Sequence, residues 1–224
     1  EWDPWEYWLM RSRRCKMVAV RDKITARGLR NHGVEVVSTG NPMMDDLSKA
    51  QCPNDFKTYR RLILLCGSRS PEAYQNFKKL LIAIQLIQIS SSMAVFVPLN
   101  SSSMRKKIEF ILIELGFKTT NESRSKIGIS AIWKKKSLLV LIGFNQFSSW
   151  AHWGEVGVAN AGTATEQLVG LGIPCVSLPG KGHQFNFNFA KRQSRLLGGA
   201  VVVSRGYKHL AKQVEFLLNS EFDR

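Results

Sequence analysis

Short, continuous apolar runs recur along most of this 224-residue chain and alternate with stretches of helical periodicity. Runs such as residues 62–66 and 138–142 lack polar alternation, which is typical of strands buried on both faces of a sheet. Between such runs, residues 71–89 place apolar side chains along one helix face. This order predicts an α/β fold with an open, doubly wound, mostly parallel sheet. The expected strands are residues 17–20, 34–38, 62–66, 94–98, 129–133, 138–142, 155–159, 173–178 and 200–203.

Composition narrows the class of protein. Hydrophobic residues make up 44% of the chain, enough for a packed core, but no apolar run reaches the roughly 18 residues of a membrane-spanning helix. Four cysteines form no C-x-x-C pair, and Cys66 and Cys175 lie in apolar runs, where we expect them to pack in the core. This pattern favours a reducing, cytoplasmic location. The histidines show no metal spacing, so we expect no metal site, and no cofactor is implied.

The net charge of +15 is large for this length, and basic residues cluster at 11–16, 105–107 and 134–136. Such charge attracts phosphates, anionic lipid headgroups or nucleic acid, although a solvated basic surface explains it equally well. No aromatic RNA-binding strand or helix-turn-helix signature is present, so no nucleic acid partner is expected. An anionic membrane surface stays open as a partner, with the protein peripheral on the inner face of the membrane.

Turn-forming residues cluster between residues 40 and 53, which predicts a boundary there. We expect residues 1–50 to be the tail of an N-terminal domain plus a linker, because they hold too few elements for a domain of their own. Residues 51–224 hold a complete series of strands and helices and form the second expected domain.

The first strand-to-helix junction of this second domain contains Gly67, Arg69, Ser70, Pro71 and Glu72. Glycine permits the backbone conformation needed directly after a strand, serine is a common N-cap, and proline fits the first helical position. Free backbone N–H groups beside an arginine would receive a phosphate or diphosphate. Spacing alone, however, favours a capped helix with a surface arginine.

A second junction, residues 158–167, is rich in small residues that let a ligand approach a helix start closely. Thr163 and Glu166 form a T-x-x-E pattern, which predicts a capping box. A diphosphate on the N–H groups there would be stabilised by the helix dipole. Both junctions are expected at the carboxyl ends of parallel strands, where ligands bind in open α/β sheets.

A third segment, residues 179–190, combines glycines, Lys181 and several amides, which suit a ligand rich in hydroxyl groups. Phe185 and Phe189 are spaced i, i+4, and we expect them to face the core. The chain contains no G-x-x-x-x-G-K-[ST], G-x-G-x-x-G or G-x-S-x-G motif. These absences weaken P-loop, dehydrogenase and α/β-hydrolase interpretations.

Together these segments resemble the C-terminal domain of GT-B glycosyltransferases, most closely the lipid-A-disaccharide synthase family and proteins described as related to it. Residues 64–72 are similar to the family's L-L-P-G-S-R-x-x-E stretch, with Cys66 in place of proline. Residues 161–164, followed by Gly172, Ile173 and Pro174, resemble its S-G-T-A…P segment. Residues 40–45 are similar to the interdomain G-N-P-x-x-D, so the resemblance spans almost the whole chain.

The resemblance implies a nucleotide-sugar site, usually for a uridine diphosphate (UDP) sugar. It places the first junction in the cleft, the second near the diphosphate, and two amides of the third segment near the donor sugar. Where the family has an acidic residue that binds ribose, this chain has Gln167, with Glu166 as the neighbouring candidate. The expected site residues are Gly67, Ser68, Arg69, Gly162, Thr163, Ala164, Glu166, Gln167, Gln184 and Asn188.

The implied activity is that of a hexosyltransferase that moves a sugar from a UDP-sugar to a lipid-linked sugar acceptor, inverting the anomeric carbon without a metal. The family's catalytic base belongs to the N-terminal domain, so no catalytic residue is assigned, and activity of this chain alone is doubtful. Self-association into a homo-oligomer stays open. One alternative is a UDP-GlcNAc 2-epimerase-like enzyme, which needs acid–base carboxylates that the sequence does not reveal. The other is a non-catalytic protein that binds nucleotide sugars or anionic membranes.

Overall fold

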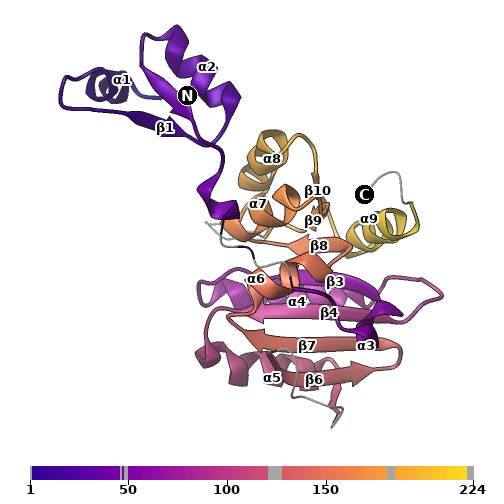
Figure 1. The fold of residues 1–224 in the computed structure, drawn as a ribbon. Helices are drawn as coiled ribbons and strands as arrows, with labels where there is room; N and C mark the ends of the chain where they lie inside the picture. The colour runs from indigo at the N-terminus through magenta and orange to yellow at the C-terminus, as the bar shows by residue number, and fades with distance from the viewer. Residues whose placement is uncertain (1, 46, 48–49, 121–127, 181–184, 221–224) are drawn as a thin grey trace. The chain divides into compact units, whose positions relative to one another are not determined.

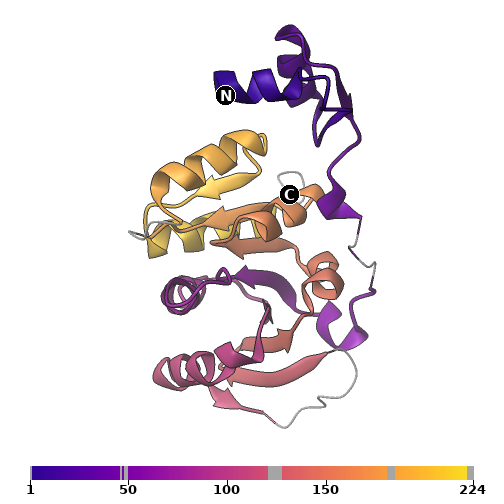
Figure 2. The same ribbon diagram turned by 90° about the vertical axis from the view of Figure 1, so that its left-hand side faces the viewer.

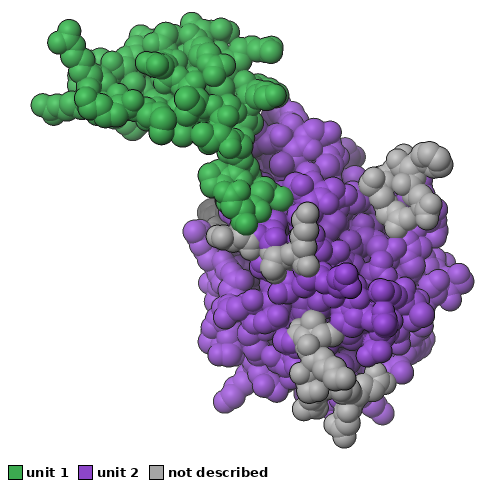
Figure 3. Space-filling view, in the orientation of Figure 1, with its two compact units in different colours: residues 1–46 green, residues 47–224 purple. Residues whose placement is uncertain are grey.

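The computed structural model describes residues 2–45, 47, 50–120, 128–180 and 185–220. The chain divides into two compact units, residues 1–46 (unit 1) and residues 47–224 (unit 2), which Figure 3 shows in different colours. Each unit has a hydrophobic core of its own.

Unit 1 is a small α/β unit. Its elements are α1 (Pro4–Met10), β1 (Val18–Val20), α2 (Lys23–Asn31), β2 (Val36–Ser38) and a 3-10 turn, η1 (Pro42–Met44). β1 and β2 pair in parallel, and α2 packs Ala26 and Leu29 against Val34 and Val36. The Asp22 carboxylate accepts a hydrogen bond from the Thr25 N–H at 2.7 Å and so caps α2.

The described residues of unit 2 form one eight-stranded sheet in the order β10-β9-β8-β3-β4-β7-β6-β5 (Figure 1). The strands are β3 (Arg60–Leu65), β4 (Met93–Leu99), β5 (Lys118–Thr119), β6 (Ile129–Lys135), β7 (Leu138–Phe144), β8 (Val156–Ala159), β9 (Cys175–Ser177) and β10 (Val201–Val203). All neighbouring pairs are parallel except β5–β6 and β6–β7. The predicted fold class is confirmed, and the departure from strand–helix alternation is the β6–β7 hairpin, which turns through Lys136 at φ +52°.

Helices cover both faces of this sheet. They are α3 (Asn54–Lys57), α4 (Glu72–Ile84), α5 (Arg105–Glu114), α6 (Phe147–Trp150), α7 (Thr163–Gly170), α8 (Phe187–Leu196) and α9 (Tyr207–Asn219), with 3-10 turns η2 (Ser102–Met104) and η3 (Ala151–Trp153). Figures 1 and 2 show α4 and α5 on one face and α3 and α6 on the other. Consecutive strand residues therefore enter opposite cores: Val95 packs in the core under α4 and α5, and Phe96 packs with Trp150 in the other.

Cys66 and Cys175 are buried free thiols, as their apolar surroundings predict. Burial raises the pKa of each to about 12, so both thiols stay protonated near neutral pH. Within the described ranges, no helix is both long and apolar enough to cross a bilayer.

Candidate functional site

A cleft of about 700 Å³ opens at the carboxyl ends of β3, β4 and β8. β3 lies between β4 and β8, so the chain winds away from β3 in one direction toward β4 and in the other toward β8. In open parallel sheets, the crevice at such a reversal of strand order is where ligands bind. The volume is within the usual range for a small-molecule site.

The β3–α4 junction forms one wall. Gly67 has φ +87°, and a Cβ there would lie 3.2 Å from the Asn160 carbonyl oxygen, so glycine is needed for both conformation and space. Ser68 and Arg69 also line the cleft. The expected Ser70 cap is wrong: Pro71 occupies the N-cap position of α4, and no side chain caps the helix. Backbone carbonyls take the place of a side-chain cap: the Ala73 N–H donates to the Arg69 carbonyl oxygen at 2.9 Å and the Tyr74 N–H to the Pro71 carbonyl oxygen at 3.2 Å.

The β8–α7 junction forms the facing wall. The predicted capping box is wrong, because Gly162 is the N-cap and Thr163 is already the first helical residue. The Gly162 carbonyl oxygen accepts hydrogen bonds from the N–H groups of Thr165 and Glu166, and no side chain caps this helix either. Thr163 and Ala164 line the cleft with their backbone at the positive end of α7.

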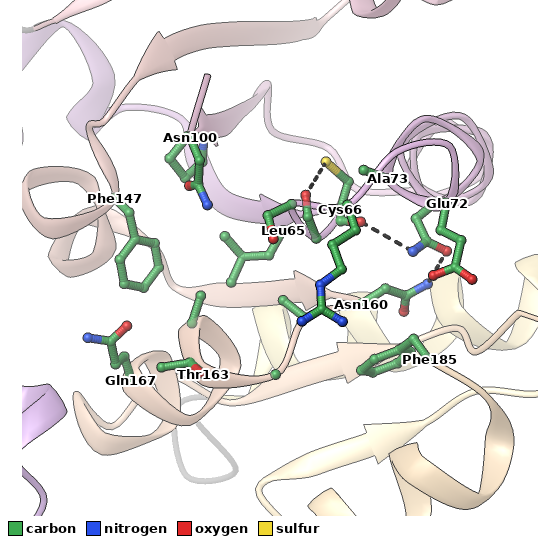
Figure 4. A pocket seen from close by; sticks show the side chains of 18 of the residues that line it. Leu65, Cys66, Glu72, Ala73, Asn100, Phe147, Asn160, Thr163, Gln167 and Phe185 are labelled. Atoms are coloured by element: carbon green, nitrogen blue, oxygen red, sulfur yellow. Dashed lines mark hydrogen bonds between the residues drawn. The ribbon is translucent and has the colours of Figure 1, made fainter. Parts of the chain in front are cut away.

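The side-chain amides of Asn160, which is buried (Figure 4), and of the partly buried Asn76 hold the walls together. The Asn160 Nδ2 donates to the Leu178 carbonyl at 2.8 Å and to Asn76 Oδ1 at 3.1 Å, and the Leu178 N–H donates to Asn160 Oδ1 at 3.0 Å. Asn76 in turn donates to the Cys66 carbonyl at 3.2 Å. Both asparagines line the cleft, and the signal for Asn160 is a polar residue that ends an otherwise apolar strand.

Seven of the ten expected site residues line this one cleft: Gly67, Ser68, Arg69, Gly162, Thr163, Ala164 and Gln167. Glu166 does not line the cleft. Adjacent residues of a helix point about 100° apart, and in α7 it is Gln167 that points toward the cleft. Asn188 is exposed on α8 and lies outside the cleft wall, so its expected place there is not supported. Gln184 lies outside the described residues.

Aromatic side chains contribute where none was expected. Phe185 and Phe189 line the cleft with ring centroids 5.3 Å apart, and Phe189 is 40% exposed, so the expectation that it faces the core is wrong. An i, i+4 spacing identifies a helix face but not what covers it. Phe147 and Asn100 also line the cleft. Each follows the carboxyl end of a strand, β7 and β4, which is the signal that could have identified them.

The cleft wall carries little charge. Arg69 is its cation and Glu72 its carboxylate among the described lining residues, and the other polar side chains are amides and hydroxyls. Arg69 is exposed and forms no ion pair with any carboxylate in the described ranges. Over the same ranges, no group of three His, Cys, Asp or Glu side chains could hold a metal ion. The site therefore offers one guanidinium, two helix starts and neutral hydrogen-bonding groups.

No protein-family model matches the chain, and no curated protein matches its sequence. Solved structures do match its fold. A putative UDP-N-acetylglucosamine 2-epimerase from Listeria monocytogenes superposes with a TM-score of 0.58 at 11% identity, over 93% of this chain and 52% of that one. The S. aureus MnaA–UDP co-structure gives 0.56 at 14%, over 92% and 52%. The UDP-GlcNAc 2-epimerase from Methanocaldococcus jannaschii gives 0.56 at 17%, over 92% and 56%.

The unit-2 sheet and these likenesses confirm the predicted open α/β fold of the GT-B type. This chain spans about half the length of each of the three solved chains. At these identities the likeness establishes the fold alone, and the chemistry has to be argued from the cleft.

Proposed function

We propose that the cleft holds a UDP-sugar and that this chain is the donor-binding half of a hexosyltransferase related to lipid-A-disaccharide synthase. The observation that carries the proposal is a convergence at the reversal of strand order: two helix starts without side-chain caps meet one arginine that pairs with no carboxylate among the described residues. In this interpretation residues 1–50 are the tail of the acceptor-binding domain.

The diphosphate fits between the two helix starts. At the start of α7 the N–H groups of Thr163 and Ala164 precede Thr165, the first residue that donates back to Gly162, and at the start of α4 the N–H group of Glu72 precedes Ala73, which donates to the Arg69 carbonyl. Both starts carry the positive end of a helix dipole. Arg69 adds a full positive charge and hydrogen-bond donors suited to phosphate oxygens. Gly67 and Gly162 have no side chain and Ala164 has a single methyl group, so phosphate oxygens can approach the backbone closely.

The two ends of the cleft differ in a way that orients the donor. Figure 4 shows Phe147, Gln167 and Asn100 toward one end and Glu72 and Phe185 toward the other. A phenyl ring beside two amides suits a planar base and the ribose hydroxyls, so we place the uridine there. The sugar then lies toward Phe185.

Transfer would proceed by attack of an acceptor hydroxyl on the anomeric carbon. The bond from that carbon to the β-phosphate oxygen breaks, and UDP leaves with the electron pair. Helix N–H groups and Arg69 would stabilise the charge that develops on the leaving diphosphate. The base that takes the hydroxyl proton is assigned to the acceptor-binding domain, and no residue of this chain is assigned that role.

Unit 1 supports a lipid-linked acceptor and an anionic membrane surface as partner. Trp5 and Trp8 on the outer side of α1 are 60% and 71% exposed, and Leu9 beside them is also exposed. Arg13 and Arg14 follow and are exposed as well. Tryptophans and leucine on one helix side with adjacent arginines are typical of a segment that lies at a bilayer interface. Co-sedimentation with anionic and with neutral vesicles tests this; binding to neither would contradict it.

A 2-epimerase is the second candidate, because two of the matching solved structures named above are called UDP-GlcNAc 2-epimerases and a third contains UDP. Inverting the configuration at a sugar carbon requires groups that remove and return a proton. Glu72 is the carboxylate available in the described cleft wall. Incubation with UDP-GlcNAc separates the candidates: formation of UDP-N-acetylmannosamine, followed by NMR, would replace the transferase with the epimerase.

Thermal unfolding with and without nucleotide tests the shared part of the proposal. A ligand that binds only the folded state stabilises it, so saturating UDP should raise the melting temperature by a few degrees. ADP should have a smaller effect. No shift with UDP, or an equal shift with ADP, would contradict the uridine assignment.

A further inference from the structure

Gln193 on α8 is a buried amide outside the cleft wall, with a side chain only 3% exposed. Its Nε2 donates to the carbonyl oxygens of Ala161 and Gly162, at 3.2 and 3.1 Å. A primary amide has two N–H donors, so one can serve each carbonyl. The Thr165 hydroxyl donates to the Ala161 carbonyl as well, at 2.7 Å.

Together with the Thr165 and Glu166 N–H groups, which donate to the Gly162 carbonyl at 3.1 and 3.3 Å, these contacts hold the direction of two peptide units. A peptide unit is planar and trans, so its C=O and N–H point in opposite directions. When the carbonyls of Ala161 and Gly162 point to the buried Gln193, the N–H groups of Gly162 and Thr163 point the other way. Ala161, Gly162 and Thr163 line the cleft and Gln193 does not, so that other side is the cleft.

The Gln193 oxygen shows that this arrangement has a cost. Oε1 is buried and accepts no hydrogen bond from any described group, and an unpaired buried oxygen destabilises a fold. Turning the amide over would bring Oε1 against two carbonyl oxygens. An apolar side chain of similar length would avoid the unpaired oxygen but would lose both donors.

We propose that Gln193 is a positioning residue that aims the N–H groups of Gly162 and Thr163 into the cleft, where they bind the diphosphate. This inference rests on the phosphate site of the proposed function. Gln193 lies outside the cleft wall and acts through the two carbonyls, whose hold it shares with Thr165 and Glu166.

Gln193→Leu removes both donors, and Gln193→Glu places a carboxyl group against the same carbonyls. We expect each variant to weaken UDP binding by about tenfold or more, measured by calorimetry, while uridine affinity, measured by ligand-observed NMR, changes less than threefold. The loss should therefore fall on the phosphates. The control is Val214→Ala, which opens a cavity in the core on the other face of the sheet. It should lower the melting temperature and leave both affinities unchanged.

A ligand-free measurement separates this inference from the uridine assignment. In Gln193→Leu, the backbone amide resonances of Gly162 and Thr163 should shift, whereas those of Gly67 and Ser68 should not. Inorganic pyrophosphate serves as a second probe. If the parent binds pyrophosphate but does not prefer UDP over ADP, the uridine assignment fails. The role of Gln193 is then tested by the loss of pyrophosphate affinity in the Gln193 variants. Unchanged Gly162 and Thr163 resonances, equal losses of uridine and UDP affinity, or a parent that binds neither UDP nor pyrophosphate would overturn the inference.

Discussion

β3 and β8 are parallel neighbours, so their amino ends lie together and their carboxyl ends lie together. Arginines are found near both ends, in different surroundings. At the amino ends, Glu155 forms an ion pair with Arg60, with an N–O distance of 3.0 Å, and accepts a 2.8 Å hydrogen bond from the Arg61 N–H. At the carboxyl ends, Arg69 faces a cleft with no ion-pair partner among the described carboxylates.

The difference separates charge that stabilises the fold from charge that can serve a ligand. The Glu155 side chain is 14% exposed, and its loss would leave two guanidinium groups near the sheet without their counter-charge. Arg69 is exposed, so the fold gains little from it, while helix starts beside it add to its attraction for anions. Substitutions at the two ends should therefore affect stability and binding separately.

The largest effect is expected at the amino end. Glu155→Gln should lower the free energy of unfolding by about 3 kcal/mol, because it removes a largely buried charge from two arginines. Nucleotide affinity at the opposite end should be unchanged. Glu114→Gln is the matched control: it breaks the Lys78–Glu114 pair, whose side chains are 40% and 46% exposed, and should cost less than about 1 kcal/mol. If urea unfolding gives the same loss of unfolding free energy for Glu155→Gln and Glu114→Gln, the buried ion pair does not stabilise the fold more than the exposed one.

Acid should remove the same stabilisation. Burial alone raises the pKa of the Glu155 carboxyl, but hydrogen bonds from Arg60 and Arg61 and the attraction of both guanidinium groups outweigh it, so the pKa lies below its ordinary value of 4.5. A group whose pKa is lowered by folding stabilises fully above its unfolded value and loses that contribution as pH falls through the folded value. The stability difference between the parent and Glu155→Gln should therefore be constant at neutral pH and shrink below about pH 4.5. A difference that stays constant down to pH 3 would contradict the role of this charge.

At the carboxyl end, Arg69→Ala should weaken UDP binding by about 1.5–3 kcal/mol, the range for a hydrogen bond to a charged group. Stability should barely change, because the side chain is exposed and pairs with no described carboxylate. Arg69→Lys should recover part of the affinity, since lysine keeps the charge but not the planar pair of donors. Normal binding by Arg69→Ala, or a large loss of stability, would make this arginine a structural residue like those at the amino end.

The layered fold could be predicted because burial on both faces leaves a direct mark on sequence. Val95 and Phe96 are adjacent apolar residues that enter opposite cores, and only a strand covered on both sides requires this. The β6–β7 hairpin left a weaker mark. Its two strands are apolar like the parallel ones, and the short turn at Lys136 has none of the glycine or asparagine that usually indicates a hairpin.

The site was predictable where it depends on local backbone and not where it depends on packing. Gly67 and Gly162 follow strands and were expected at the cleft. The helix starts were misplaced, because Ser70 and Thr163 are good caps in isolation and the path of the chain out of each strand decides which residue reaches the cap position. Phe147 follows β7, and it reaches the same cleft because the strand order places β7 beside β4.

The smallest effect concerns Glu166 and Gln167, which turn to different sides of α7. Gln167 lines the cleft and Glu166 does not, so Gln167→Ala should weaken UDP binding by about 0.5–1.5 kcal/mol, the value of a neutral hydrogen bond to ribose. Glu166→Ala should leave affinity unchanged, and without a capping box its effect on stability should stay below that of losing an N-cap, about 1 kcal/mol. Calorimetry with UDP and 2′-deoxy-UDP shows whether Gln167 contacts the ribose 2′-hydroxyl or another part of the nucleotide. The parent should prefer UDP, and Gln167→Ala should lose that preference. If Gln167→Ala keeps it and Glu166→Ala loses it, the ribose lies on the other side of α7, and the orientation of the donor in the cleft has to be reversed.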